Sequence, residues 1–122
     1  IIVDVKATSR INFDWFETFN KYEYAKAYKR QLEMYQWLFK KNGFPVAKEA
    51  YLLYFNGKKN EEFFNNQLNF DVHLIKLDCS TSWVENKIID TVNLLRSDVF
   101  PKPSLNCEYC NYLKKRWQLS IT

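Results

Sequence analysis

Glycine and proline are scarce in this chain, with 2 Gly and 3 Pro among 122 residues. So few residues that break regular structure, together with 47% hydrophobic residues, exclude a disordered or low-complexity protein. Apolar runs are also short, and none approaches the roughly 18 residues that a membrane span requires. We therefore expect a single globular domain over residues 1–122, with no membrane partner.

Cysteine and histidine are few as well, with 3 Cys and 1 His. An odd number of cysteines argues against a full disulfide framework and favours a cytoplasmic, reducing location or a metal site. With His73 as the only histidine, no Ser-His-Asp or Cys-His arrangement has support. The net charge of +4 is mildly basic, which allows a polyanionic partner without demanding one.

The hydrophobic pattern predicts an α/β protein whose elements follow the order β-α-β-β-α, with a short Cys-bearing C-terminal segment after them. Strands are expected over residues 1–7, 47–55 and 68–78, and helices over residues 21–42 and 83–97. Residues 11–20 have no clear period and are expected to form a loop with at most a short helical turn. The last two strands flank a turn at residues 56–60, so we expect them to pair as a hairpin.

Asp4 and Lys6 are the first candidates for chemistry. Side chains alternate along a strand, so these two point to the same face. A carboxylate there can hold a hard divalent cation such as Mg²⁺, and an ammonium can stabilise charge on an attacking water or a phosphate oxyanion. An acid and a lysine at this spacing also arise by chance on a solvated strand face, so the pair alone decides nothing.

The helix predicted over residues 21–42 supplies two more candidates. Gln31 and Tyr35 are four residues apart and share one helical face. A glutamine can orient a catalytic carboxylate or water, and a tyrosine can bond a phosphate or stack on a base. The alternative is that Tyr35 belongs to the core and Gln31 to the surface.

Taken together, Asp4-x-Lys6-x-Thr8-Ser9 in a strand and Gln31-x-x-x-Tyr35 in the next helix resemble the PD-(D/E)XK nuclease superfamily. The branch they resemble most is the RecB-type exonuclease domain, including CRISPR-associated and AddAB-type members. The resemblance extends over residues 1–116, because the order of elements agrees as well. It implies a restriction-endonuclease-like core with a mixed sheet flanked by helices. It also implies Mg²⁺- or Mn²⁺-dependent hydrolysis of DNA in repair, recombination or phage and CRISPR-related processes, with DNA and a helicase or other repair subunit as partners.

The resemblance also implies a role for each motif residue. Asp4 is expected to bind the metal, with the Val5 backbone carbonyl as a further ligand, and Lys6 to stabilise the nucleophile and the transition state. Gln31 and Tyr35 are expected to support the site and contact the nucleic-acid backbone. Further contacts to the nucleic acid are expected from Thr8, Ser9, Lys29 and Arg30. For the last two, a solvated helix face is the alternative.

Cys107 and Cys110 form a C-terminal Cys-x-x-Cys segment similar to that of RecB-type domains. Members with an iron–sulfur cluster carry a third Cys where this chain has Arg116, and a fourth far upstream; Cys79 does not match that pattern. Four interpretations stay open: a degenerate cluster site, a site completed by sequence outside this chain, a Zn²⁺ site, or two reduced cysteines that pack a small tail. Of these interpretations, those in which Cys107 and Cys110 bind an iron–sulfur cluster or Zn²⁺ are less favoured.

The family's second metal-binding acid lies on a strand before the Asp4 strand, whereas this chain opens at Ile1. We therefore expect a domain without its N-terminal part, which holds half of an active site. A function from another class is the alternative: a catalytically inactive nucleic-acid-binding or scaffolding module with the same fold. A small zinc-binding interaction domain is a third, weaker possibility, and it predicts loss of folding on chelation.

Overall fold

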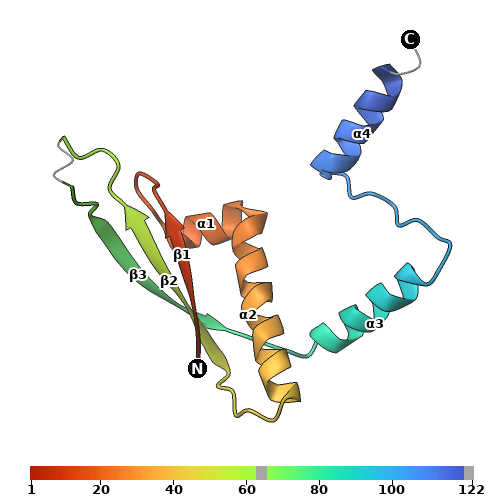
Figure 1. The fold of residues 1–122 in the computed structure, drawn as a ribbon, viewed down its shortest axis with the longest axis horizontal. Coiled ribbons are helices and arrows are strands. Elements are labelled where there is room, and N and C mark those ends of the chain that lie inside the picture. Colours follow the sequence, from red (N-terminus) through yellow and green to blue (C-terminus); the bar gives the residue numbers. More distant parts are fainter. Residues whose placement is uncertain (63–65, 120–122) are drawn as a thin grey trace. The chain divides into compact units, whose positions relative to one another are not determined.

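The computed structural model describes residues 1–62 and 66–119 (Figure 1). Its elements are β1 (Ile2–Thr8), α1 (Trp15–Lys21), α2 (Glu23–Lys41), β2 (Glu49–Gly57), β3 (Phe70–Asp78), α3 (Val84–Leu95) and α4 (Glu108–Leu119). The described residues thus form a small α/β protein with a three-stranded mixed sheet and four helices. The chain divides into two compact units, residues 1–86 and 87–122, and each is described by itself. None of the described helices is long and apolar enough to cross a membrane.

The sheet has the strand order β1-β2-β3. Strand β2 pairs with β1 in parallel and with β3 in antiparallel orientation, so the predicted hairpin is confirmed. A parallel pair needs a long crossover connection, and here the crossover holds α1 and α2. The register places Asp4, Leu52 and Ile75 in one row across the sheet, and Lys6, Tyr54 and His73 in the next.

Two helices were not predicted as such. Residues 11–20 were expected to form a loop, but α1 begins at Trp15. The Asp14 side chain caps it by accepting a hydrogen bond from the backbone N–H of Glu17 at 2.9 Å. Tyr22, with extended backbone (φ −119°, ψ 124°), separates α1 from α2. The Cys-bearing C-terminal segment is likewise a helix, α4.

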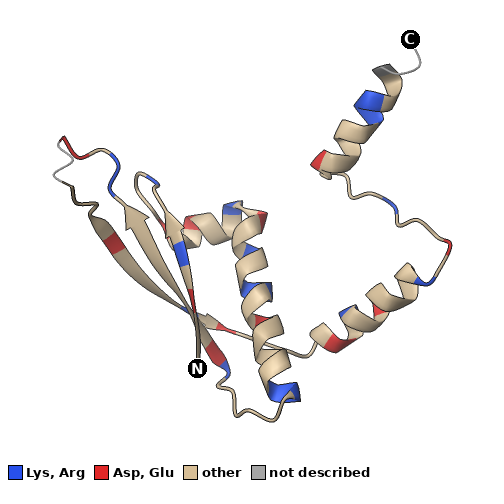
Figure 2. Ribbon diagram, in the orientation of Figure 1, with Lys and Arg blue, Asp and Glu red and all other residues tan. Residues whose placement is uncertain are grey.

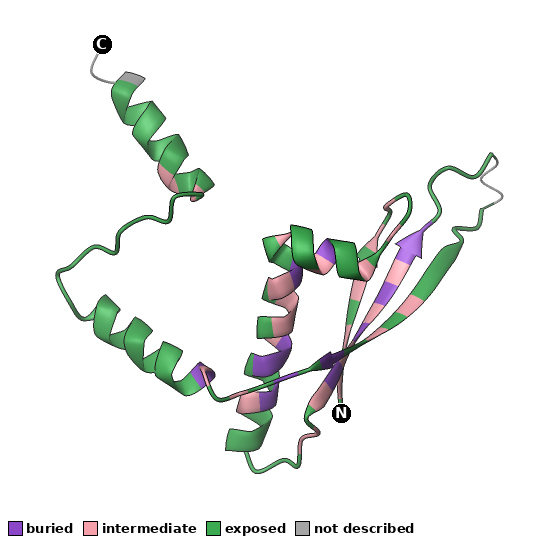
Figure 3. Cartoon of the chain, turned by 180° about the vertical axis from the view of Figure 1, so that it is seen from behind, coloured by how far each residue is buried: buried purple, intermediate pink, exposed green. Residues whose placement is uncertain are grey.

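The core of residues 1–86 lies between the sheet and α2. Its buried hydrophobic side chains are Leu32, Ala50, Leu52, Tyr54, Leu77 and Cys79. The buried positions of β2 alternate with less buried ones, as expected for a strand with one covered face. Figure 3 shows the buried residues on β2 and on the side of α2 that faces the sheet. On the other face of the sheet, Val3, Val5, Val72 and Leu74 are exposed.

Two buried polar side chains fix the C-terminal half of α2 to the rest of the fold. Gln36 Nε2 lies 3.1 to 3.4 Å from the backbone carbonyls of residues 47–49, just before and at the start of β2. The Glu33 carboxylate accepts hydrogen bonds from the Ser80 N–H at 3.0 Å and from the Trp83 indole N–H at 2.7 Å. These contacts hold α2 against the sheet, and Gln31 is thereby kept within hydrogen-bond distance of β1.

Candidate active site

Strand β1 turns its charged side chains inward and its valines outward. The side chains of Asp4 and Lys6 are 21% and 18% exposed, whereas Val3 and Val5 are 52% and 60% exposed. A half-buried strand ordinarily has the opposite arrangement, with apolar residues on the covered face. Figure 2 marks the charged residues along β1 and α2. An inverted strand of this kind is what a site for charged chemistry requires, because it holds charges where water is partly excluded.

Asp4, Lys6, Tyr28, Gln31 and Tyr35 form one connected group, here named the Lys6 cluster. Lys6 Nζ is 2.8 Å from Asp4 Oδ2, and it donates a hydrogen bond to Gln31 Oε1 at 3.0 Å. The same ammonium lies 4.3 Å from the centroid of the Tyr28 ring. Gln31 Nε2 donates to the Tyr35 hydroxyl at 2.7 Å. The two sequence motifs thus meet in space.

The Asp4 carboxylate keeps capacity to bind a further group. Its Oδ2 is screened from solvent and accepts no hydrogen bond of ordinary geometry from the described residues, and the Lys6 ammonium is its ion-pair partner. Buried carboxylate oxygens are normally well supplied with hydrogen bonds. Within residues 1–62 and 66–119, no three His, Cys, Asp or Glu side chains converge as a metal-binding group. In the Lys6 cluster, Asp4 is therefore the single carboxylate that can bind a cation.

A cavity of about 280 Å³ lies next to Tyr28 and is here named the tyrosine cavity. Its lining residues are Ala7, Thr8, Arg10, Phe13, Tyr24, Tyr28 and Tyr54. Tyr54 is 3% exposed, and its hydroxyl has no hydrogen-bond partner among residues 1–62 and 66–119. Burial raises the pKa of Tyr54 well above its usual range, and the neighbouring Tyr28 and Tyr24 add to the rise. Sequence analysis did not select Tyr54.

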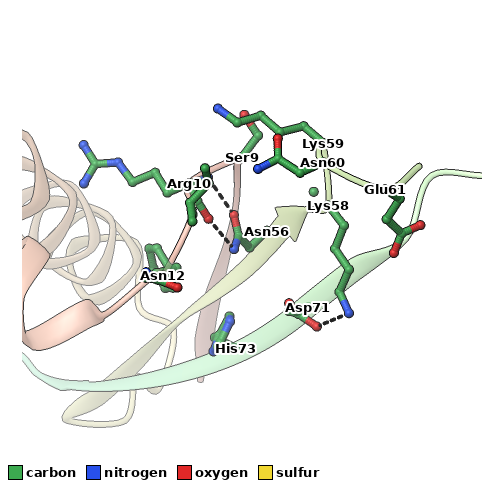
Figure 4. Close-up of a pocket in the computed structure, with 13 residues that line it drawn as sticks. Ser9, Arg10, Asn12, Asn56, Lys58, Lys59, Asn60, Glu61, Asp71 and His73 are labelled. Carbon is green, nitrogen blue, oxygen red and sulfur yellow. Dashed lines mark hydrogen bonds and ion pairs between the residues drawn. The ribbon is translucent and has the colours of Figure 1, made fainter. Parts of the chain in front are cut away.

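A second cavity, of about 400 Å³, opens at the carboxyl ends of β1 and β2 (Figure 4). Asn56 builds its wall by exchanging two hydrogen bonds with the backbone of Arg10, at 2.9 and 3.0 Å. Lys58 is paired with Asp71 at 3.0 Å on the opposite side. The Arg10 side chain points away from Asn56 in Figure 4, and its guanidinium lies 4.5 Å from the Tyr22 ring centroid. Arg10 thus lines both this cavity and the tyrosine cavity.

The other residues selected from the sequence fall in different places. Thr8 lines the tyrosine cavity, and Ser9 lines the second cavity, shown in Figure 4.

Lys29 is separated from Gln31 by about 200° around the axis of α2, and its Nζ lies 4.0 Å from Glu33 Oε1, so Lys29 faces away from the Lys6 cluster. Arg30 is exposed. The Val5 side chain points to the open face, and the role of its carbonyl stays a prediction.

Cys107 and Cys110 lie in the second unit, at the start of α4. Their Sγ atoms are 2.9 Å apart, and Cys107 Sγ accepts a hydrogen bond from the Cys110 backbone N–H at 3.3 Å. Hydrogen bonding from the Cys110 side chain lowers the pKa of Cys107, and the same interaction raises the pKa of Cys110. Both thiols are free, as is Cys79. A metal at this pair stays a prediction.

Comparison with known proteins places this chain in no family. No family model, no curated protein and no solved structure gives a significant match. What the site can do is therefore argued from its own geometry and from the motifs.

Proposed function

We propose that this chain is a nuclease domain of the PD-(D/E)XK superfamily, of the RecB type, with a restriction-endonuclease-like core. Its reaction would be Mg²⁺- or Mn²⁺-dependent hydrolysis of phosphodiester bonds in DNA. The observation that supports this is the contact between the two motifs: Lys6 of β1 and Gln31 of α2, 25 residues apart in the chain, are joined by a hydrogen bond. The inward orientation of Asp4 and Lys6 on β1 adds to it.

The Asp4 carboxylate fits the requirements of a divalent cation in part. Mg²⁺ is commonly held by one or two carboxylates together with substrate phosphates and water. Lys6 engages Asp4 Oδ2 at 2.8 Å, so a cation would bind through the other carboxylate oxygen, Oδ1. Such a cation, when bound, lowers the pKa of a bound water and neutralises phosphate charge.

Lys6 is the cationic residue of the site. Its ammonium is held by Asp4 and Gln31 and lies over the ring of Tyr28, which restricts where the charge can point. A fixed ammonium is suited to stabilise negative charge on a phosphate oxygen in the transition state. Because the Gln31 amide donates to the Tyr35 hydroxyl, its oxygen is turned toward Lys6. Gln31 and Tyr35 thus act as positioning residues.

The alternative function, an inactive nucleic-acid-binding or scaffolding module of the same fold, has one observation in its favour. The Lys6 cluster contains a single carboxylate, and the part of the chain that the structure describes holds no group of three metal ligands. In either case DNA is the proposed partner. The three free thiols agree with a cytoplasmic location, which belongs to the same proposal.

The test is cleavage of labelled single- and double-stranded DNA by the longest available version of the chain, including any sequence that precedes Ile1. We expect cleavage that needs Mg²⁺ or Mn²⁺ and stops with a chelator. Lys6→Ala should lower the rate by at least about 10²-fold, as expected when a transition-state donor is removed. The control is Lys26→Ala, which removes an exposed lysine of α2 that pairs with Glu23 and should leave the rate unchanged. DNA binding without cleavage would favour the inactive module.

A further inference from the structure

Cys107 and Cys110 hold their two thiols in direct contact at the start of α4. Their Sγ atoms are 2.9 Å apart. Both thiols are free, and both residues are half-buried, so each sulfur is reduced and within reach of a small molecule. Because the sulfurs already touch, an S–S bond between them requires only small movements of the two side chains.

The start of α4 makes the two thiols unequal. The Cys107 carbonyl accepts the first hydrogen bond of the helix, from the Asn111 N–H at 3.0 Å, so Cys107 occupies the N-cap position. Its Sγ accepts a hydrogen bond from the Cys110 backbone N–H at 3.3 Å. Backbone N–H groups and the positive end of the helix dipole stabilise a thiolate at this position. Cys107 is therefore the thiol favoured as nucleophile, and Cys110 stands where it can attack the Cys107 sulfur.

The surroundings of the two thiols supply too few donors for an ordinary metal centre. A structural Zn²⁺ site takes four ligands, and an iron–sulfur cluster is commonly held by four cysteines. Among residues 1–62 and 66–119, no third His, Cys, Asp or Glu side chain converges with Cys107 and Cys110. The donor set of the described residues therefore fits a reactive dithiol better than a metal site.

We propose that Cys107 and Cys110 form a thiol–disulfide exchange site whose substrates are small-molecule disulfides. The Cys107 thiolate attacks one sulfur of the disulfide, which forms a mixed disulfide and releases the first thiolate. The Cys110 thiolate then attacks Cys107 Sγ, which closes the Cys107–Cys110 bond and releases the second thiolate. The two cysteines are oxidised and the small disulfide is reduced, and the two cysteine protons pass through water to the released thiolates. This proposal does not rest on the nuclease function, because it uses none of the residues of the Lys6 cluster.

The test is the reaction of the reduced 122-residue chain with glutathione disulfide in the absence of oxygen, stopped with N-ethylmaleimide and followed by intact mass and peptide mapping. Wild type should end with a Cys107–Cys110 disulfide and no lasting glutathione adduct. Cys110→Ser should stop at the mixed disulfide on Cys107. Cys107→Ser should react about 10-fold more slowly than Cys110→Ser, because the remaining thiol lacks the stabilisation that the helix start gives to a thiolate.

Cys79→Ser is the matched control, since Cys79 is 5% exposed and its removal should leave the rate of disulfide formation unchanged. Equal rates for Cys107→Ser and Cys110→Ser, or lasting glutathione adducts on both thiols of wild type, would overturn the proposal. A stoichiometric content of iron or zinc in the purified chain, measured by mass spectrometry of the elements, would also overturn it, because the pair would then be a metal site. None of these outcomes depends on whether the longest chain cleaves DNA.

Discussion

On the face of the sheet that α2 covers, Ala50 and Leu52 are wholly buried beside two charged side chains, Asp4 and Lys6, whereas on the other face Val3 and Val5 lie in solvent. Packing alone would favour the reverse on β1, because burial of a valine side chain contributes roughly 1.5 kcal/mol or more and burial of a charge costs free energy. Strand β2 follows the packing rule and β1 breaks it. Local violations of this kind are expected at functional sites.

The covered face itself contains two kinds of buried acid. Glu33 is satisfied, since it accepts hydrogen bonds from Ser80 and Trp83. Asp4 has an ion-pair partner but an oxygen that accepts no hydrogen bond within the described residues. The first carboxylate connects α2 to the segment after β3, and the second keeps its capacity for a ligand. We therefore expect the two acids to respond oppositely to removal.

The two faces of the sheet should differ most in how much stability a side chain loses when it is truncated to alanine. Leu52→Ala removes a fully buried side chain and should lower the free energy of unfolding by about 2–5 kcal/mol. Leu74→Ala, a change of the same chemistry on the exposed face, should cost less than about 1 kcal/mol. Urea unfolding followed by circular dichroism measures both. Equal losses would mean that the open face is covered in solution.

Removal of the Glu33 carboxylate should cause the next largest loss in the free energy of unfolding. Glu33→Ala leaves the Trp83 indole N–H and the Ser80 N–H without their acceptor, and we expect a loss of about 2–4 kcal/mol in the free energy of unfolding. Trp83 fluorescence should change as its environment loosens. Glu23→Ala on the same helix, at an exposed ion pair with Lys26, is the control and should leave the unfolding midpoint in place. A small effect of Glu33→Ala would show that these hydrogen bonds are replaced by water.

Replacement of the Asp4–Lys6 ion pair should change the free energy of unfolding in the opposite direction. Asp4→Leu with Lys6→Met replaces a mostly buried ion pair by apolar side chains, and the free energy of unfolding should stay equal or rise by about 1 kcal/mol. DNA cleavage by the longest chain should be lost in the same variant. The control pair Lys58→Met with Asp71→Leu, at an exposed ion pair, should bring no gain. A clear loss of stability in the first variant would make Asp4 and Lys6 structural residues.

The elements that carry the site could be predicted because they obey simple periods. Alternation along β1 placed Asp4 and Lys6 on one face, and four-residue spacing placed Gln31 beside Tyr35. Helix α1 was missed because seven residues are too few to show a clear period, although Trp15 and Phe19 stand four residues apart, and Asp14 as N-cap went unused. Helix α4 was not assigned as an element because its cysteines directed attention to a metal segment instead.

The tyrosine cavity lay beyond the reach of sequence patterns. Arg10 comes from a loop, Tyr28 from α2 and Tyr54 from β2, and only the parallel pairing of β1 with β2 brings them together. A local pattern reports which face a residue occupies, and no period in the sequence reports that a hydroxyl lacks a partner. The ion pair of Lys29 with Glu33 was likewise not visible in the sequence pattern, and the contact of Lys29 with nucleic acid stays a prediction.

The smallest effect we expect concerns Tyr54. Because its hydroxyl has no hydrogen-bond partner in the described part of the chain, Tyr54→Phe should leave the free energy of unfolding equal or raise it by up to about 1 kcal/mol. Burial raises the pKa of Tyr54 in the folded chain above the value of about 10 in the unfolded chain, so its stabilising contribution is full below that pH and is lost as the pH rises further. The advantage of Tyr54→Phe over wild type should therefore grow when urea unfolding is repeated above about pH 10. A variant less stable than wild type at neutral pH would mean that the hydroxyl is already hydrogen-bonded in solution.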